Sequence, residues 1–134
     1  MPTSDVYLGN PNLKRANTAH EFTEEQVIEF LKCKEDPVYF ARNYIQIVSL
    51  DEGLVPFNMY DFQEKLIRNF HESRFNICKM PRQTGKSTTC VSYLLHYAVF
   101  NDNVNIAILA NKASTARDLL GRFCLLYTSG RCRR

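Results

Sequence analysis

Residues 75–90 read Phe-Asn-Ile-Cys-Lys-Met-Pro-Arg-Gln-Thr-Gly-Lys-Ser-Thr-Thr-Cys, and this stretch decides which fold the sequence predicts. The apolar run from Phe75 to Met80 predicts a strand, and the residues from Lys86 onward have the pattern of a helix. A strand, a loop and a helix in this order are the setting of a phosphate-binding loop. Two residues are unusual for such a loop, because Met80 replaces its first glycine and Arg82 lies inside it.

The loop residues have the chemistry that a phosphate site needs. Gly85 lacks a Cβ atom, so its backbone can take up left-handed conformations and approach a phosphate closely. The amides at the start of the next helix lack helical partners, and the helix dipole makes that end positive. Lys86 would reach the β- and γ-phosphates, and the Ser87 hydroxyl would bind Mg²⁺. We therefore predict a nucleotide site formed by Gln83, Thr84, Gly85, Lys86, Ser87 and Thr88. The alternative is an ordinary strand-to-helix turn with an exposed lysine.

The elements that follow the loop predict an α/β fold. A second apolar run, Val104 to Ala110, predicts a buried strand of a parallel sheet, and residues 111–123 predict a helix. Strand, helix, strand and helix from residue 75 onward make a βαβ unit, and therefore a three-layer α/β fold. We expect the parallel sheet and flanking helices of a P-loop NTPase of the helicase or RecA-like type.

The residues before the loop predict a helical preface to this fold. Helix starts are expected at the capping box Thr23–Gln26, at Asp36-Pro37 and at Asp61, where the aspartates act as caps. A strand is expected at Ile45–Leu50, followed by a turn at residues 51–53. Residues 1–20 are polar and contain Gly-Asn-Pro-Asn at 9–12, which should break regular structure, so we predict a flexible N-terminal arm.

Three side chains near the loop have both a functional and a structural interpretation. Gln63 can hydrogen-bond the edges of adenine, and the ring of Phe62 can stack on the base. Alternatively, Phe62 is a core residue and Gln63 a surface residue. Arg82 can neutralise charge at the γ-phosphate as an arginine finger, or it can pair with a carboxylate such as Glu64. Beside a phosphate loop we favour the functional interpretation of all three.

Asn111 and Lys112 follow directly after the second predicted strand. Ligands of α/β sheets bind beyond the carboxyl ends of the strands, so the polar run 111–115 could contact DNA phosphates or the nucleotide sugar. Helix capping by Asn111 or Ser114 explains the same residues equally well, and both interpretations stay open.

Charge and composition limit which other functions are compatible with the sequence. The 134 residues carry 17 basic and 14 acidic side chains, and Arg131, Arg133 and Arg134 account for the whole surplus. The rest of the chain is neutral and offers no electrostatic argument for nucleic-acid binding. No apolar run of about 18 residues predicts a membrane span, and no secretory signal is recognised at the N-terminus. None of the five cysteines forms C-x-x-C, so we expect reduced thiols rather than a zinc site, with Cys78 and Cys90 in the core.

We expect residues 124–134 to be non-native. The run Cys124-Leu-Leu-Tyr-Thr-Ser129 can be encoded by TGTCTCTTATACACATCT, which resembles the end sequence of a transposon used in sequencing-library adapters. Residues 130–134, Gly-Arg-Cys-Arg-Arg, fit the continuation of the adapter if one base was inserted. The alternative is a genuine polar C-terminus.

Several motifs, in the right order along the chain, closely resemble those of the large terminase subunit of contractile-tailed phages. They are Gly9–Arg15, Asp36–Phe40, Tyr60–Gln63, Met80–Thr88 and Ile106–Arg117. The resemblance extends from residue 9 to Phe123. A loop of the form Arg-Gln-x-Gly-Lys-[ST] without the first glycine is this family's own version, so Met80 no longer counts as a defect.

This resemblance implies an ATP-binding motor that packages viral DNA into a prohead. On the matching positions, Lys86 and Ser87 would hold the phosphate and the metal, and Arg82 would be an arginine finger supplied in cis. Phe62 and Gln63 would form the adenine pocket. Asn111 and Lys112 would occupy the place of the helicase-like motif after the second strand, where contact with DNA or coupling to the motor is implied.

The resemblance also implies cofactors, partners and a location. The cofactors would be ATP and Mg²⁺, and the partners would be double-stranded viral DNA, the portal protein and the small terminase subunit. Full-length members would form a homo-oligomeric motor ring without membrane contact, in the host cytoplasm and transiently at the portal vertex of the prohead.

Residues 21–123 would be the first half of the ATPase domain, the half that holds the phosphate loop. The family's acidic motif, with its Mg²⁺-binding Asp and water-activating Glu, and its nuclease domain have no counterpart in these 134 residues. We therefore expect ATP hydrolysis by the full-length parent protein and none by this chain alone. Two alternatives are the first lobe of a superfamily-two-type helicase and a nucleotide-binding module without catalysis.

Overall fold

Five helices and two short hairpins make up the part of the chain that the computed structural model describes, which is residues 6–7, 10–14, 22–49 and 51–131. The helices are α1 (Glu24–Glu35), α2 (Pro37–Tyr44), α3 (Asp61–Glu72), α4 (Lys86–Phe100) and α5 (Ala113–Arg131). The strands pair antiparallel, β1 (Val6–Tyr7) with β2 (Asn10–Lys14) and β3 (Gln46–Ser49) with β4 (Gly53–Pro56).

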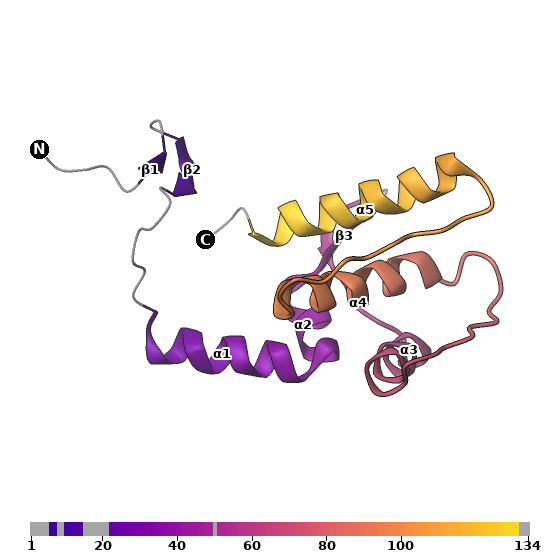
Figure 1. Cartoon of the computed structure of the whole chain (residues 1–134), viewed down its shortest axis with the longest axis horizontal. Helices are drawn as coiled ribbons and strands as arrows, with labels where there is room; N and C mark the ends of the chain where they lie inside the picture. Colours follow the sequence, from indigo (N-terminus) through magenta and orange to yellow (C-terminus); the bar gives the residue numbers. More distant parts are fainter. Residues whose placement is uncertain (1–5, 8–9, 15–21, 50, 132–134) are drawn as a thin grey trace, which may run out of the picture.

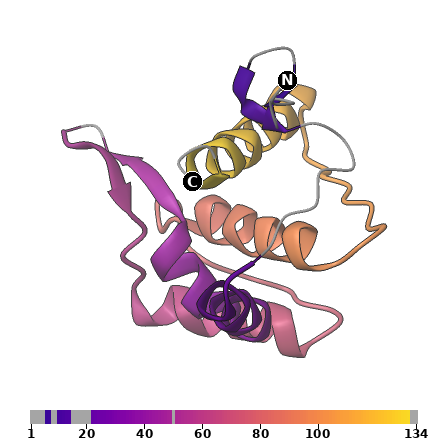
Figure 2. The same cartoon turned by 90° about the vertical axis from the view of Figure 1, so that its left-hand side faces the viewer.

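α4 occupies the centre of the helical assembly (Figure 1). α5 covers one side of α4 and runs in the same direction, while α3 and α2 pack against other parts of its surface. The β3–β4 hairpin projects from the helices, as Figure 2 shows. The buried hydrophobic core is contributed by Val38, Ala41, Ile45, Phe57, Ile67, Val91, Leu95 and Leu126.

The helix starts follow from local capping. Thr23 Oγ1 accepts the Gln26 N–H at 3.3 Å and Gln26 Oε1 accepts the Thr23 N–H at 3.1 Å, which confirms the predicted capping box of α1. Asp36 Oδ1 accepts the Val38 N–H at 2.9 Å, with Pro37 as the first residue of α2, as predicted. The helix start at Asp61 is confirmed, although the cap position of α3 is Tyr60.

The predicted parallel sheet is wrong. Residues 76–81 and 104–110 run without regular secondary structure, and the sheets among the described residues are the two antiparallel hairpins. The side chains of Phe75, Ile77 and Leu109 are 82%, 101% and 94% exposed. A parallel strand obtains its hydrogen bonds from neighbouring strands and its burial from layers on both faces. In the described structure these two runs have neither neighbouring strands to hydrogen-bond with nor layers that bury both of their faces. α4 packs between helices instead of on a sheet.

Two further expectations about the first half of the chain can be compared with the structure. The strand expected at 45–50 is confirmed as β3, with Leu50 outside the described residues, and Gly53 follows the turn with a φ of 74°. The expectation that residues 9–12 break regular structure is wrong for Asn10, Pro11 and Asn12, which lie in β2. Most of the predicted arm 1–20 lies outside the described residues, and its flexibility stays a prediction.

The last helix is longer than predicted. α5 continues from Ala113 to Arg131 and so passes through the start of the segment that we expect to be non-native. Leu126 in that segment is 6% exposed and belongs to the core cluster. Whether residues 124–134 belong to the native protein stays a prediction. In the described part of the chain, no helix has the length and apolar character needed to cross a membrane.

His96 of α4 is a buried titratable group at the centre of the helices. It is 3% exposed, its Nε2 lies 2.8 Å from the carbonyl oxygen of Cys33, and its ring centroid lies 4.8 Å from that of Phe100. Nδ1 is buried without a hydrogen-bond partner in the described structure. Burial lowers the pKa of His96 below the ordinary value of 6.5, because desolvation disfavours the imidazolium.

We predict that acid destabilises the fold through His96. The pKa of His96 is lower in the folded state than in the unfolded state. His96 therefore contributes its full stabilisation at pH values above its unfolded-state pKa, and this stabilisation is lost as the pH falls through its folded-state pKa. The melting temperature of the wild type should therefore fall as the pH drops below about 6.5, and less so in His96→Gln, which cannot titrate. Circular dichroism melts measure this. His71→Gln, which removes an exposed histidine, should keep most of the fall; equal slopes for wild type and His96→Gln would contradict the prediction.

Candidate functional site

The candidate site is the loop that leads into α4. The chain turns at Arg82 and Gln83, and Gly85 occupies the cap position of α4 with φ 73°, as its proposed role requires. Gln83 also has a left-handed backbone, with φ 64°. A non-glycine residue in this region costs about 1–2 kcal/mol, and such strain is concentrated at functional loops. The loop therefore holds two left-handed residues separated only by Thr84.

The amino group of Lys86 turns back onto its own loop. Lys86 Nζ donates to the carbonyl oxygens of Met80, at 3.0 Å, and of Pro81. Thr84 Oγ1 donates to the same Pro81 carbonyl at 3.1 Å. The backbone amides of the first turn of α4 precede the first helical hydrogen bond, which Thr89 N–H makes to the Gly85 carbonyl at 2.9 Å. A phosphate bound at these amides would replace the two carbonyls as the partner of Lys86.

Ser87 and Thr88 complete the first turn of α4. Ser87 is exposed and Thr88 half-buried, so the Ser87 hydroxyl is accessible for a metal ion. No group of three or more His, Cys, Asp or Glu side chains suited to a metal occurs among the described residues. The residues present fit the type of Mg²⁺ site in which phosphates and waters supply most of the ligands.

Gln63 joins α3 to the loop. Its side chain is 4% exposed, Oε1 accepts the Tyr60 N–H at 3.0 Å, and Nε2 donates to the Thr84 carbonyl at 3.2 Å. Gln63 precedes the predicted strand 75–80 and Thr84 follows it, and the two residues are thus brought into contact. The prediction that both belong to one nucleotide site requires this contact. The alternative that Gln63 is a surface residue is wrong.

Phe62 lies on the exposed side of the same helix start. It is 41% exposed, which overturns the alternative that it is a core residue, and its ring stacks on that of Tyr60 at 5.7 Å between centroids and 7° between planes. Tyr60 is 69% exposed and was not assigned to the site from the sequence. The sequence feature that could have assigned Tyr60 to the site is its aromatic side chain, two positions before Phe62. The pair forms a flat aromatic surface beside Gln63.

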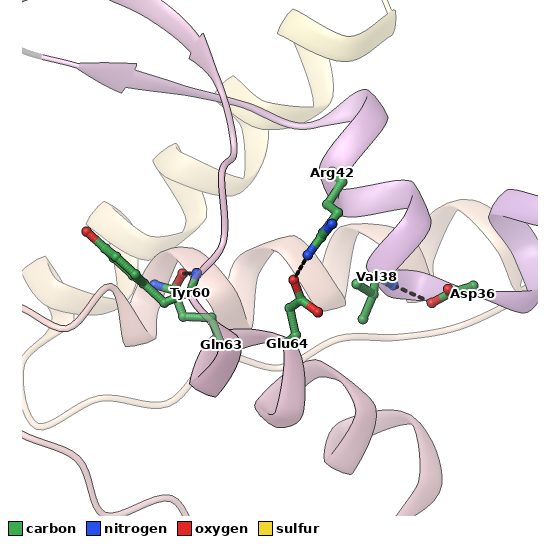
Figure 3. A network of polar contacts seen from close by, with 6 residues as sticks. All are labelled: Asp36, Val38, Arg42, Tyr60, Gln63 and Glu64. Atoms are coloured by element: carbon green, nitrogen blue, oxygen red, sulfur yellow. Dashed lines mark hydrogen bonds and ion pairs between the residues drawn. The ribbon is translucent and has the colours of Figure 1, made fainter.

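Arg82 and Glu64 do not pair. Glu64 of α3 forms an ion pair with Arg42 of α2 (Figure 3), which binds these two helices to each other. The structural alternative that Arg82 pairs with Glu64 is therefore wrong. Arg82 is exposed in the turn, and its guanidinium has no hydrogen-bond or ion-pair partner within the described part of the chain.

Asn111 and Lys112 lie just before α5, and both are exposed. The Lys112 carbonyl accepts the Ala116 N–H at 3.3 Å at the start of α5. The starting ends of α4 and α5 lie on the same side of the molecule in Figure 1, because the two helices run in the same direction. Within the described residues, no hydrogen bond or ion pair joins Asn111 or Lys112 to the loop, and their role stays a prediction.

Cys78 departs from the predicted core. It is exposed, as are Phe75 and Ile77 in the same segment, whereas Cys90 of α4 is half-buried. Burial raises the pKa of the Cys90 thiol, with the nearby Cys78 as a second cause, so Cys90 is a weak nucleophile. A scan against models of known protein families finds no match to this sequence.

We predict that Gly85→Ala damages the loop. A Cβ atom at this position would lie 2.5 Å from Gln63 Nε2, and φ 73° is unfavourable for alanine. The variant should lose about 1–2 kcal/mol or more of unfolding free energy and lose the Gln63 contact. Urea denaturation measures this.

Gly121→Ala is the matched control for that variant. Gly121 lies inside α5, and nothing lies within 4 Å of an added Cβ. This substitution should stabilise the protein by about 0.5–1 kcal/mol, because alanine favours a helix interior over glycine. Equal effects of the two substitutions would contradict the proposed constraint at Gly85.

We also predict that Gln63→Leu destabilises the loop. Leucine has a similar volume but would leave the Tyr60 N–H and the Thr84 carbonyl without their present partner. The expected loss is about 1–3 kcal/mol of unfolding free energy, together with faster amide hydrogen exchange in residues 82–88. Gln26→Leu is the control, because Gln26 forms a comparable capping contact at the exposed start of α1. Exchange at 82–88 that stays unchanged in Gln63→Leu would show that Gln63 does not support the loop.

Proposed function

We propose that this chain is the nucleotide-binding part of a viral terminase large subunit, the ATP-driven motor that packages phage DNA into a prohead. The observation that carries the proposal is the convergence of Gln63, Gly85 and Lys86 at the start of α4. The ordered motifs of the sequence support it as well. The proposal rests on the loop and helix and does not require a sheet behind them.

The chemistry of the loop supports the proposed binding of ATP and Mg²⁺. The amides and positive dipole end of α4 would bind the phosphates, and Lys86 would exchange the Met80 and Pro81 carbonyls for phosphate oxygens. Ser87 would contribute its hydroxyl to Mg²⁺. Gln83, Thr84 and Thr88 would surround the phosphates through their backbone.

The base and the γ-phosphate would meet different side chains. Phe62, with Tyr60 stacked on it, offers an exposed aromatic surface for adenine. Gln63, whose buried side chain is bonded to the Tyr60 N–H and the Thr84 carbonyl, would have to reorient to hydrogen-bond the base. Arg82, which has no described partner, would turn to the γ-phosphate and neutralise charge in the transition state.

The role in DNA packaging goes beyond nucleotide binding. Asn111 and Lys112, at the starting end of α5, would contact the viral DNA or couple nucleotide state to movement. The portal protein, the small terminase subunit and further copies of the chain would be partners of the full-length motor, in the host cytoplasm and at the portal vertex.

A nucleotide-binding module without catalysis is the second candidate. One observation favours it for this chain by itself: Glu64, the carboxylate adjacent to Gln63 in sequence, is directed to Arg42 of α2 and not to the loop (Figure 3). The two candidates share the nucleotide site and differ in turnover.

We predict that this chain binds a fluorescent ATP analogue in the presence of Mg²⁺ and that Lys86→Ala weakens binding by roughly tenfold or more. A charge-assisted hydrogen bond is worth about 1.5–3 kcal/mol, and a factor of ten corresponds to about 1.4 kcal/mol. Fluorescence anisotropy measures the affinity. Lys65→Ala, which removes an exposed lysine of α3, should bind as the wild type does. Equal affinity of wild type and Lys86→Ala would overturn the nucleotide site.

Turnover separates the two candidates. In the full-length protein, DNA should stimulate ATP hydrolysis, and Arg82→Ala should keep nucleotide binding while losing turnover, by a factor of about 10³ or more for a finger arginine. Absence of DNA-stimulated hydrolysis in the full-length protein would exclude the motor. Unchanged turnover in Arg82→Ala would exclude Arg82 as the finger.

A further inference from the structure

The side chains that could meet a nucleobase beside the loop differ sharply in exposure. Gln63 is 4% exposed, whereas Phe62 is 41% and Tyr60 69% exposed. An amide recognises the edge of a base by hydrogen bonds, and an aromatic ring recognises the face of a base by stacking. The exposed groups at this site are therefore the rings, while the amide that could read the edge of a base is buried.

The amide of Gln63 is held in one orientation by two contacts within the protein. Oε1 accepts the N–H of Tyr60 at 3.0 Å, and Nε2 donates to the carbonyl of Thr84 at 3.2 Å. A flipped amide would set a donor against the N–H and an acceptor against the carbonyl, so the observed orientation is the one that satisfies both partners. Nε2 also occupies the space beside Gly85, 2.5 Å from where a Cβ atom would lie. Gln63 therefore acts as a support of the loop.

Turning the Gln63 amide towards a base would cost more than it returns. The N–H of Tyr60 and the carbonyl of Thr84 would both lose their partner, in contacts that are partly buried. A polar group left unpaired away from water costs its full desolvation penalty, whereas a new hydrogen bond to a base only replaces one to water. We therefore expect Gln63 to keep its present contacts when a nucleotide binds.

The two rings are arranged for stacking. Tyr60 and Phe62 lie nearly parallel, with 5.7 Å between ring centroids and 7° between planes. The Tyr60 side chain extends away from Gln63, with its hydroxyl at the far end (Figure 3). Every nucleobase has a π face, so stacking tolerates different bases, and a two-ring purine offers more area for it than a one-ring pyrimidine.

We propose that this site accepts purine nucleoside triphosphates without distinguishing adenine from guanine. Tyr60 and Phe62 stack on the base, the phosphates bind at the loop, and Gln63 stays a structural support. The inference rests on the proposed nucleotide site and concerns the base alone. A site built to hydrogen-bond one group of its substrate rejects the analogue without that group by a factor of about 10⁴–10⁵, and a buried, engaged Gln63 does not supply such a contact.

Competition binding tests the selectivity. Unlabelled ATP, GTP and CTP, each with Mg²⁺, displace the fluorescent ATP analogue from the 134-residue chain, and anisotropy gives their affinities. ATP and GTP should bind within about threefold of each other, and CTP roughly tenfold more weakly, because its single ring stacks over less area. An affinity for GTP that is tenfold or more below that for ATP would overturn the inference, and so would CTP binding as tightly as ATP.

Failure of the proposed function gives a different result. If the analogue does not bind, or binds equally to the wild type and to Lys86→Ala, the nucleotide site is excluded and this inference with it. Binding that depends on Lys86 but strongly prefers ATP to GTP keeps the nucleotide site and rejects the present inference alone.

Two variants and one control locate the stacking. Tyr60→Leu removes the ring but keeps the backbone N–H that Gln63 accepts, so the loop keeps its support. This variant should bind ATP and GTP roughly tenfold more weakly, and inorganic triphosphate as tightly as the wild type does, because triphosphate has no base. Tyr97→Leu is the control, since Tyr97 is a 41% exposed residue of α4 about 16 Å along the helix from Lys86. It should change none of the three affinities.

Phe62→Leu is the second variant and should show the same selective loss. Unchanged affinities for ATP and GTP in both ring variants would reject the two rings as the site of the base. If Tyr60→Leu also weakens triphosphate binding, and so damages the loop, Phe62→Leu decides: unchanged nucleotide affinities in that variant would then reject the inference.

Discussion

The buried face of α4 organises the described structure, because α2, α3 and α5 all pack against this one helix. Val91 and Leu95 contribute apolar bulk to that face, while Thr89 and Ser92 are small and also buried. The Thr89 hydroxyl is satisfied by the Gly85 carbonyl at 3.1 Å, so burying it does not leave an unpaired donor. Since this contact lies in the first turn, the packing of the core also holds the starting end of α4, where the candidate nucleotide loop begins.

The loop is supported from α3 as well as from α4. Gln63 reaches from the start of α3 to the Thr84 carbonyl, and its amide lies where a Cβ atom at residue 85 would have to be. α3 is itself held by burial of Leu66 and Ile67 and by the ion pair of Glu64 with Arg42. An exposed ion pair contributes little energy, so the apolar contacts are the main support. A phosphate-type loop can thus keep a defined shape between helices.

α4 also connects the candidate nucleotide loop to a cluster of aromatic rings at its other end. Its first residue, Lys86, belongs to the loop, and the ring of its last residue, Phe100, lies 5.4 Å from that of Phe40 between centroids. Its 15 residues separate these ends by about 22 Å at 1.5 Å per residue.

Much of the helical part was predictable from the sequence, because helix capping depends on residues within one turn of one another. Thr23 with Gln26 and Asp36 with Pro37 are local signals, and the helices start where these signals place them. The apolar runs at 75–80 and 104–110 predict strands that the structure does not form. Hydrophobicity shows that a segment is suited to burial, whereas a strand also needs hydrogen-bonding neighbours from elsewhere in the chain.

The helix starts, the left-handed glycine before α4 and the composition of the loop each depend on a few adjacent residues, so they could be predicted from the sequence. The support of the loop by Gln63, the pairing of Glu64 with Arg42 and not with Arg82, and the place of Glu29 beside Tyr39 and Tyr44 became known from the folded structure. These contacts join residues 10 to 22 positions apart in the chain. They exist because packing on α4 brings separate helices together, and no local pattern encodes that arrangement.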